Sequence, residues 1–179
     1  MPEVFKTQLD GLLLIKPKVF ADGRGFFMES WNKGFYESVG INENFVQDNI
    51  SKSEYRVLRG LHLQTEPYSQ GKLIQVVEGE IFDVAVDCRK NSPTFGKYEA
   101  ITLSEDNKYQ LFIPQNFAHG FQVLSDKATI LYKCTDFYVR SHERTILWND
   151  IDIGIDWPIK NSILSERDKN GIQFKNLWK

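Results

Sequence analysis

Charged and titratable side chains interrupt an apolar stretch of the sequence between residues 58 and 87. Within LRGLHLQTEPYSQGKLIQVVEGEIFDVAVD, the leucines, isoleucines and valines are interspersed with Arg59, His62, Lys72, Asp83 and Asp87. The stretch has the pattern of three β-strands, although strand interiors are depleted in lysine and aspartate. A buried charge costs free energy unless it is paired or faces a cavity. The pattern therefore predicts either a polar pocket inside a β-structure or a half-exposed sheet whose charges face water.

Histidine is the residue that most often carries acid–base chemistry near neutral pH, and the chain has 3 histidines. His62 alternates with leucines in the run LHL, so it faces away from them, together with Gln64. His119 lies in QNFAHG (115–120), which we expect to be a loop, and His142 is expected at the surface. The residues alone indicate a β-sandwich whose pocket holds His62, Lys72 and a carboxylate.

Two further candidate groups, Tyr132 and Asp168, also have structural interpretations. Tyr132 lies in the apolar run TILYKC, which is typical of a core tyrosine with a hydrogen-bonded hydroxyl. Asp168 follows Ser165 by three residues, the spacing of a short helix that Ser165 caps. From the residues alone, the structural interpretation is favoured for both.

A metal site is not expected. Cupin-type jelly rolls often bind a metal through a His-x-His pair, and here the corresponding residues are His62-Leu63-Gln64. Anion binding would need local arginines, because arginine binds phosphate through two parallel hydrogen bonds. The candidates are Arg24, Arg59 and Arg167, none of which belongs to a phosphate-loop motif.

Length and composition limit the class of protein. The chain has 179 residues, 41% of them apolar, and a net charge of -2, which predicts one globular domain and no general affinity for polyanions. Cys88 and Cys134 lack the spacing of a metal site or redox pair. Residues 11–15, GLLLI, are too short for a signal peptide, and no stretch has the length of a membrane span. We therefore expect a soluble cytoplasmic protein that binds neither nucleic acid nor membrane.

Short strands separated by turn signals predict an all-β sandwich or barrel. Beyond the opening stretch, strands are expected at 97–103, 108–114, 121–124 and 129–137. The early segment is expected to hold a strand at 12–20 that Pro17 bends, a turn at Asp22-Gly23, a short helix from Asn32 to Gly40 and a strand near 43–53. One sandwich does not need this many strands, and a surplus strand can pair with the sheet edge of a second copy. The segment is therefore predicted to help form a dimer.

The motifs, taken in order, resemble the dTDP-4-dehydrorhamnose 3,5-epimerase family. They are DGRGFFMES (22–30), FVQDN (45–49), VLRGLHLQ (57–64), QGKLIQVVEGEIFDVAVDCR (70–89), SPTFGK (92–97), LFIPQNFAHGF (111–121), LYKCTDFY (131–138), WND (148–150) and LSERD (164–168). The resemblance implies a single cupin-type jelly-roll domain over residues 1–179, with short peripheral helices. It also implies a homodimer to which an N-terminal arm of about residues 1–50 contributes, and an activity that uses neither metal nor cofactor.

The resemblance further implies epimerisation of dTDP-4-dehydro-6-deoxy-D-glucose at C3 and C5 to dTDP-4-dehydro-L-rhamnose. By position, His62 matches the proton acceptor, Asp168 its partner, Tyr132 the proton donor and Lys72 the lysine near the C4 oxygen. Tyr138 matches an aromatic residue that stacks on thymine. The other positions that match substrate contacts are Arg24, Glu29, Gln47, Asp48, Asn49, Arg59, His119, Glu143 and Arg167.

Three alternatives to the double epimerase stay open. Relatives that epimerise only C3 or only C5 share much of this residue set, so the sequence separates them poorly. A sugar-nucleotide-binding cupin without catalysis is disfavoured by the joint presence of His62, Lys72, Tyr132 and Asp168. A metal-dependent dioxygenase cupin is disfavoured by the missing His-x-His pair.

Overall fold

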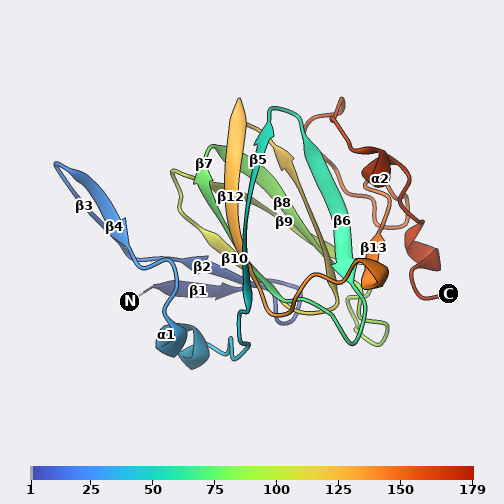
Figure 1. The fold of residues 1–179 in the computed structure, drawn as a ribbon, viewed down its shortest axis with the longest axis horizontal. Coiled ribbons are helices and arrows are strands. Elements are labelled where there is room, and N and C mark those ends of the chain that lie inside the picture. The colour runs from blue at the N-terminus through green and yellow to red at the C-terminus, as the bar shows by residue number, and fades with distance from the viewer. Residues whose placement is uncertain (1) are drawn as a thin grey trace.

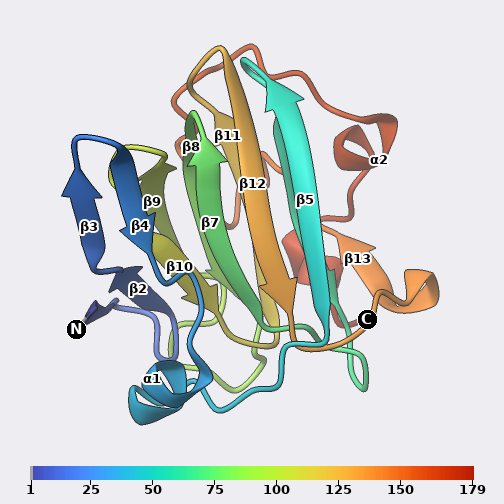
Figure 2. The ribbon, with the colours of Figure 1, turned by 60° about the vertical axis from the view of Figure 1, so that its left-hand side comes forward.

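The computed structural model describes residues 2–179 as two antiparallel β-sheets packed face to face (Figure 1). The first sheet has the strand order β1–β2–β10–β7–β12–β5, much of which can be followed in Figure 2, and the second has the order β13–β6–β11–β8–β9. The all-β sandwich expected from the sequence is confirmed. The three strands expected within residues 58–87 are β6, β7 and β8.

The bounds of the strands are as follows. The first sheet contains β1 (Glu3–Lys6), β2 (Leu13–Lys16), β10 (Gln110–Ile113), β7 (Lys72–Glu78), β12 (Lys127–Cys134) and β5 (Gln47–Glu54). The second sheet contains β13 (Glu143–Thr145), β6 (Leu58–Gln64), β11 (Phe117–Val123), β8 (Glu80–Asp87) and β9 (Tyr98–Ser104).

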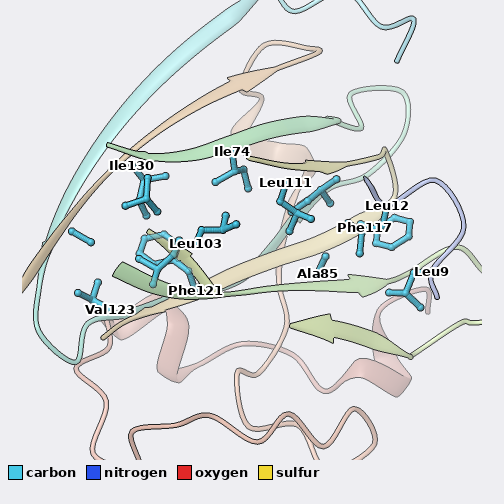
Figure 3. Close-up of a cluster of buried hydrophobic side chains, with 14 residues drawn as sticks. Leu9, Leu12, Ile74, Ala85, Leu103, Leu111, Phe117, Phe121, Val123 and Ile130 are labelled. Carbon is cyan, nitrogen blue, oxygen red and sulfur yellow. The ribbon is translucent and has the colours of Figure 1, made fainter. Parts of the chain in front are cut away.

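The main hydrophobic core lies between the two sheets (Figure 3). Side chains alternate along each strand, so Ile74 and Ile130 of the first sheet point toward Ala85 and Phe121 of the second. A second apolar cluster covers the outer face of the second sheet, where Trp157 and other residues of the C-terminal tail pack. The second sheet is therefore buried on both faces, which fixes the positions of the side chains that it presents to the interior.

The C-terminal tail places a short helix beside the second sheet. Val57 forms a parallel bridge with Ile163, so the tail runs next to the start of β6. Helix α2 (Glu166–Lys169) follows at once, and the Ser165 hydroxyl accepts a hydrogen bond from the backbone N–H of Asp168 at 3.2 Å. This is the capped turn that the sequence predicts. Two 3₁₀ helices, η1 (Arg140–His142) and η2 (Phe174–Asn176), complete the C-terminal third.

The N-terminal segment contains an arm that leaves the sandwich. Instead of one bent strand at 12–20, the chain forms β2 and then β3 (Val19–Asp22), with Pro17 between them. Strand β3 pairs with β4 (Gly25–Met28) as a separate hairpin, which Figure 1 shows extending away from the two sheets. The expected turn at Asp22-Gly23 connects these strands.

Helix α1 (Lys33–Ser38) follows the arm, and Asn32 caps it as the sequence predicts. It is the longest helix of residues 2–179, and none of their helices is long and apolar enough to cross a membrane.

Candidate active site

A cavity of about 860 Å³ opens between the sheets on the side of β5 and β6. Its volume is in the range of small-molecule sites. Strands β5, β7 and β12 form one wall, β6 and β11 form the facing wall, and the tail around α2 forms part of the rim. The residues expected from the sequence that line it are Gln47, Asn49, Arg59, His62, Lys72, His119, Tyr132, Tyr138, Glu143, Arg167 and Asp168.

His62 and Asp168 form a hydrogen-bonding pair on the β6 wall, with Asp168 buried and His62 partly exposed. Nε2 of His62 lies 2.6 Å from Oδ1 of Asp168, and the Ser165 hydroxyl donates to Oδ2 at 2.7 Å. Arg167 Nη2 lies 3.3 Å from the same imidazole nitrogen. The helical turn therefore carries the carboxylate, the hydroxyl that orients it and a neighbouring cation.

The surroundings adjust both pKa values of this pair. Burial lowers the pKa of His62, although the hydrogen bond and charge of Asp168 act in the opposite direction. Burial alone would raise the pKa of Asp168, but the hydrogen bonds from His62 and Ser165 hold it below its usual range. At neutral pH the pair is thus a neutral imidazole beside a carboxylate, which is the arrangement of a general base whose cationic form is stabilised.

Lys72 and Tyr132 lie on the facing wall. The register of β12 pairs Tyr132 with Ile74, and Cys134 with Lys72, on β7. No hydrogen bond within residues 2–179 involves the Tyr132 hydroxyl, so the bonded core tyrosine of the structural interpretation is not observed. Burial raises the pKa of Tyr132, so its phenol keeps its proton at neutral pH and can donate it. Burial lowers the pKa of Lys72, against the charges of neighbouring acidic groups that include Asp83.

His119 lies within strand β11, so the expectation that it belongs to a loop was wrong. Strand β11 begins at Phe117 because it pairs with β6 on one side and β8 on the other. In this register His119 is the direct partner of His62, and its Nε2 lies 2.6 Å from Oδ1 of Asp83. Two imidazoles, each bound to its own carboxylate, therefore stand side by side on the β6–β11 wall.

Two glycines allow β6 and β11 to approach closely next to these histidines. A Cβ on Gly120 would lie 2.8 Å from the carbonyl oxygen of Arg59, and one on Gly60 would lie 2.5 Å from Cα of Gly120. The ladder between the strands is irregular at this point. In a regular strand, residues on one face are two or four positions apart, whereas Arg59 and His62 are three apart. The irregularity allows both side chains to line the cavity.

Gln64 holds the loop that forms the outer rim. Its side-chain amide donates to the carbonyl oxygen of Phe137 at 3.1 Å and accepts from the backbone N–H of Val139 at 2.6 Å. Between these anchors stands Tyr138, whose hydroxyl donates to Glu143 at 2.9 Å and whose side chain is about half exposed. A fixed, accessible aromatic ring at the mouth of a cavity suits stacking on a planar base.

Arginines supply positive charge around the same opening. Arg167 binds Glu143 at 2.6 Å, and Nε of Arg59 donates to the Ser53 hydroxyl at 2.9 Å. Both guanidinium groups line the cavity and are held in place by these partners. They can bind a phosphate or diphosphate group.

Three residues expected at the site do not line this cavity. Arg24, on the β3–β4 hairpin, forms an ion pair with Asp22 and has a 92% exposed side chain. Glu29 hydrogen-bonds Asn32 beyond the same hairpin. Asp48 binds Lys133 at 2.9 Å on the outer face, because Gln47 and Asn49 on either side of it point inward.

Other residues of the cavity were not expected from the sequence. The polar ones are Ser51, Gln70, Cys134 and Ser165. Strand alternation was a sufficient signal for Ser51, two positions after Asn49, and for Cys134, two positions after Tyr132. Residues 2–179 contain no group of three histidine, cysteine, aspartate or glutamate side chains with the geometry of a metal site.

Comparison with known proteins agrees with this geometry. Residues 6–176 match the family model described as dTDP-4-dehydrorhamnose 3,5-epimerase. The dTDP-4-dehydrorhamnose 3,5-epimerase of Shigella flexneri is 58% identical over 172 residues, which are 96% of this chain and 95% of that protein. The crystal structure of dTDP-6-deoxy-D-glucose-3,5-epimerase from Legionella pneumophila Philadelphia 1, in complex with dTDP-4-keto-L-rhamnose, has a TM-score of 0.96 and 46% identity, covering 99% of this chain and 95% of that one.

A relative with a different name shares the same cupin-type fold. The crystal structure of a 3′-monoepimerase from Streptomyces bikiniensis, in complex with dTDP-quinovose, has a TM-score of 0.88 and 29% identity, covering 94% of this chain and 86% of that one. The fold is thus common to single and double epimerases, and the higher identities are with the double epimerases. By the match over most of its length and by these identities, the chain belongs to the dTDP-4-dehydrorhamnose 3,5-epimerase family.

Proposed function

We propose that the chain is an isomerase that epimerises dTDP-4-dehydro-6-deoxy-D-glucose at C3 and C5, giving dTDP-4-dehydro-L-rhamnose. One observation carries the proposal: the His62–Asp168 pair and Tyr132 stand on facing walls of one cavity. The C4 ketone acidifies the hydrogens on both neighbouring carbons. Inversion then needs a base on one face of the sugar ring and an acid on the other.

Each catalytic side chain has one role in this reaction. His62 takes the proton from carbon; because Asp168 engages Nε2, the proton goes to Nδ1. The electron pair of the broken C–H bond moves to the C4 oxygen, and Lys72 supplies positive charge beside the resulting enolate. Tyr132 then delivers a proton to carbon from the opposite face, and Asp168 stabilises the imidazolium. Exchange with solvent then removes the proton from His62 and returns one to the Tyr132 phenolate.

Substrate binding uses the rim of the cavity. Arg59 and Arg167 bind the diphosphate, and Tyr138 stacks on thymine. Four other polar side chains of the lining are proposed to contact the sugar and the nucleoside: Gln47, Asn49, His119 and Glu143. The support for these assignments is that the cavity holds both cations and an exposed aromatic ring at its opening.

A homodimer would bring the N-terminal residues to a cavity. The hairpin exposes Phe20, Phe26 and Phe27 by 53%, 59% and 65%, which is unfavourable in water and favours burial against another surface. We propose a second copy of the chain as that surface, with Arg24 and Glu29 of one copy reaching the cavity of the other.

The deciding experiment is proton NMR of the substrate with enzyme in deuterated water. Exchange at both C3 and C5, with formation of the inverted product, is the expected result. Exchange at one carbon would indicate a mono-epimerase, and dTDP binding without exchange would indicate a non-catalytic binding protein. His62→Asn should abolish exchange and leave dTDP affinity nearly unchanged, since other residues hold the nucleotide. The cytoplasmic location and the lack of a nucleic-acid partner stay predictions.

A further inference from the structure

A second histidine–carboxylate pair lies deeper in the sandwich than the first. Asp83 is fully buried on β8, on the face that presents Ile81 and Ala85 to the main core. Its Oδ1 lies 2.6 Å from Nε2 of His119. A carboxylate among core side chains is costly unless it is paired, so its presence needs a reason beyond packing.

The partners of Asp83 are incomplete. Its Oδ2 is buried and makes no hydrogen bond within residues 2–179. Asp87, four residues along the same strand and also fully buried, differs: Arg89, Ser92 and Thr94 donate hydrogen bonds to its carboxylate. Asp87 is therefore explained by local structure, whereas Asp83 is not.

Two nitrogen-bearing side chains of the cavity, His119 and Lys72, lie near Asp83. His119 contacts it directly, and the negative charge of Asp83 opposes the lowering of the Lys72 pKa that burial causes. Cys134 acts on the Lys72 pKa in the same sense and more strongly than Asp83, and Glu143 acts in the same sense more weakly. Lys72 forms no ion pair within 4.0 Å in residues 2–179, so Asp83 supports its charge without occupying its ammonium group. That ammonium group stays free to face a substrate.

We propose that Asp83 is a positioning residue of the active site, a role that rests on the proposed function. Asp83 holds His119 at Nε2 and supplies the negative charge that stabilises a ring protonated at both nitrogens, so that Nδ1–H of His119 and the ammonium group of Lys72 donate hydrogen bonds to the C4 oxygen of the sugar. Negative charge gathers on this oxygen when His62 removes a proton from C3 or C5. No covalent bond to Asp83 or His119 forms or breaks. The two imidazoles are paired in register on adjacent strands. His62 acts on the carbon of the enolate, and His119 acts on its oxygen.

Asp83→Asn tests this role because it removes the charge and keeps the size of the side chain. Loss of one donor to a developing oxyanion lowers kcat by about 10²–10³-fold in well-studied enzymes, and we expect a fall of that order. KM and dTDP affinity should change little, since the effect arises in the enolate rather than in the bound substrate. Asp87→Asn is the matched control, with the same change on the same strand and face. It should lower the melting temperature while kcat stays near the parental value.

Two further measurements separate positioning from a structural effect. In ¹⁵N NMR, Asp83→Asn should alter the ring signals of His119 and leave those of His62 in place. In a double-mutant cycle, His119→Gln with Asp83→Asn should be about as slow as His119→Gln alone, because both changes remove the same donor. If Asp83→Asn does not fold, the inference is tested on His119→Gln alone: a fall in kcat with a small change in KM supports it, and a parental kcat overturns it.

The outcomes distinguish this inference from the proposed function. Wild-type enzyme that inverts its substrate while Asp83→Asn or His119→Gln keeps full kcat would overturn the inference alone. So would an Asp83→Asn variant that has unchanged His119 signals and whose loss of activity is accounted for by its lower melting temperature alone. Wild-type enzyme that neither exchanges nor inverts would overturn the proposed function itself.

Discussion

Asp168→Asn removes the negative charge beside His62 and keeps the shape of the side chain. The carboxylate lies 2.6 Å from Nε2, and its hydrogen bond and charge both raise the pKa of an imidazole that burial lowers. Without that charge, the pKa of His62 falls further. The base is then neutral at lower pH, but its cationic form is less stable, so it accepts a proton from carbon less readily.

The size of the effect follows from the kind of hydrogen bond that is lost. A hydrogen bond to a charged group contributes about 1.5–3 kcal/mol, which corresponds to roughly 10- to 150-fold in rate if the full amount is lost in the transition state. The assay is deuterium exchange at C3 and C5, followed by NMR across the pH range. The exchange rate on the plateau above the acid limb should fall by this factor of roughly 10 to 150. Activity disappears at low pH as His62 becomes protonated, so this acid limb should move to lower pH.

Ser165→Ala is the control, because it loses a hydrogen bond to Asp168 and the helix cap but keeps the charge. It should reduce stability by about 1 kcal/mol and leave the acid limb in place. An Asp168→Asn enzyme with an unmoved acid limb and a nearly parental plateau would refute the assignment of His62 and Asp168 as the base and its partner.

Three further predictions concern the acid, the dimer and metal ions. Tyr132→Phe should lower inversion by about 10²–10⁴-fold and exchange by less, with little change in melting temperature, since the hydroxyl forms no hydrogen bond within residues 2–179. Equal loss of both in a variant that binds dTDP would mean that Tyr132 does more than donate a proton. Replacing Phe20 and Phe27 by aspartate should give a monomer in sedimentation with reduced activity. An intact, fully active dimer would contradict the proposed role of the β3–β4 hairpin in the dimer. Activity should survive exhaustive chelation; loss that one added metal restores would contradict the proposed mechanism.

Features that depend on neighbours in the sequence were predictable. The turn at Asp22-Gly23 and the caps Asn32 and Ser165 are all present, because turn and cap residues act within three or four positions of themselves. Pro17 divides residues 12–20 into two strands, whereas the sequence rule for proline predicts only a bend. In each case a local rule was sufficient or nearly so.

Features that depend on distant strands were not predictable from local patterns. His119 was expected in a loop because proline precedes it and glycine follows it, yet pairing on both sides makes its segment a central strand. His62 and Asp168 are 106 residues apart, and no spacing rule joins them. Only the family resemblance connected them. Asp83 is an unusual charge in a strand by sequence alone, but only the three-dimensional structure identifies His119 as its partner.

The two facing sheets explain how this fold inverts a carbon centre. His62 projects from the second sheet, and Lys72 and Tyr132 project from the first, so a sugar ring between them presents one face to the base and the other to the acid. Acid and base on one sheet would return the proton to the face that it left. Strand register therefore determines the stereochemistry. A slip of β12 by one residue would turn Tyr132 outward and Lys133 inward, and the continuous pairing of β12 with β5 from Lys127 to Cys134 opposes that slip.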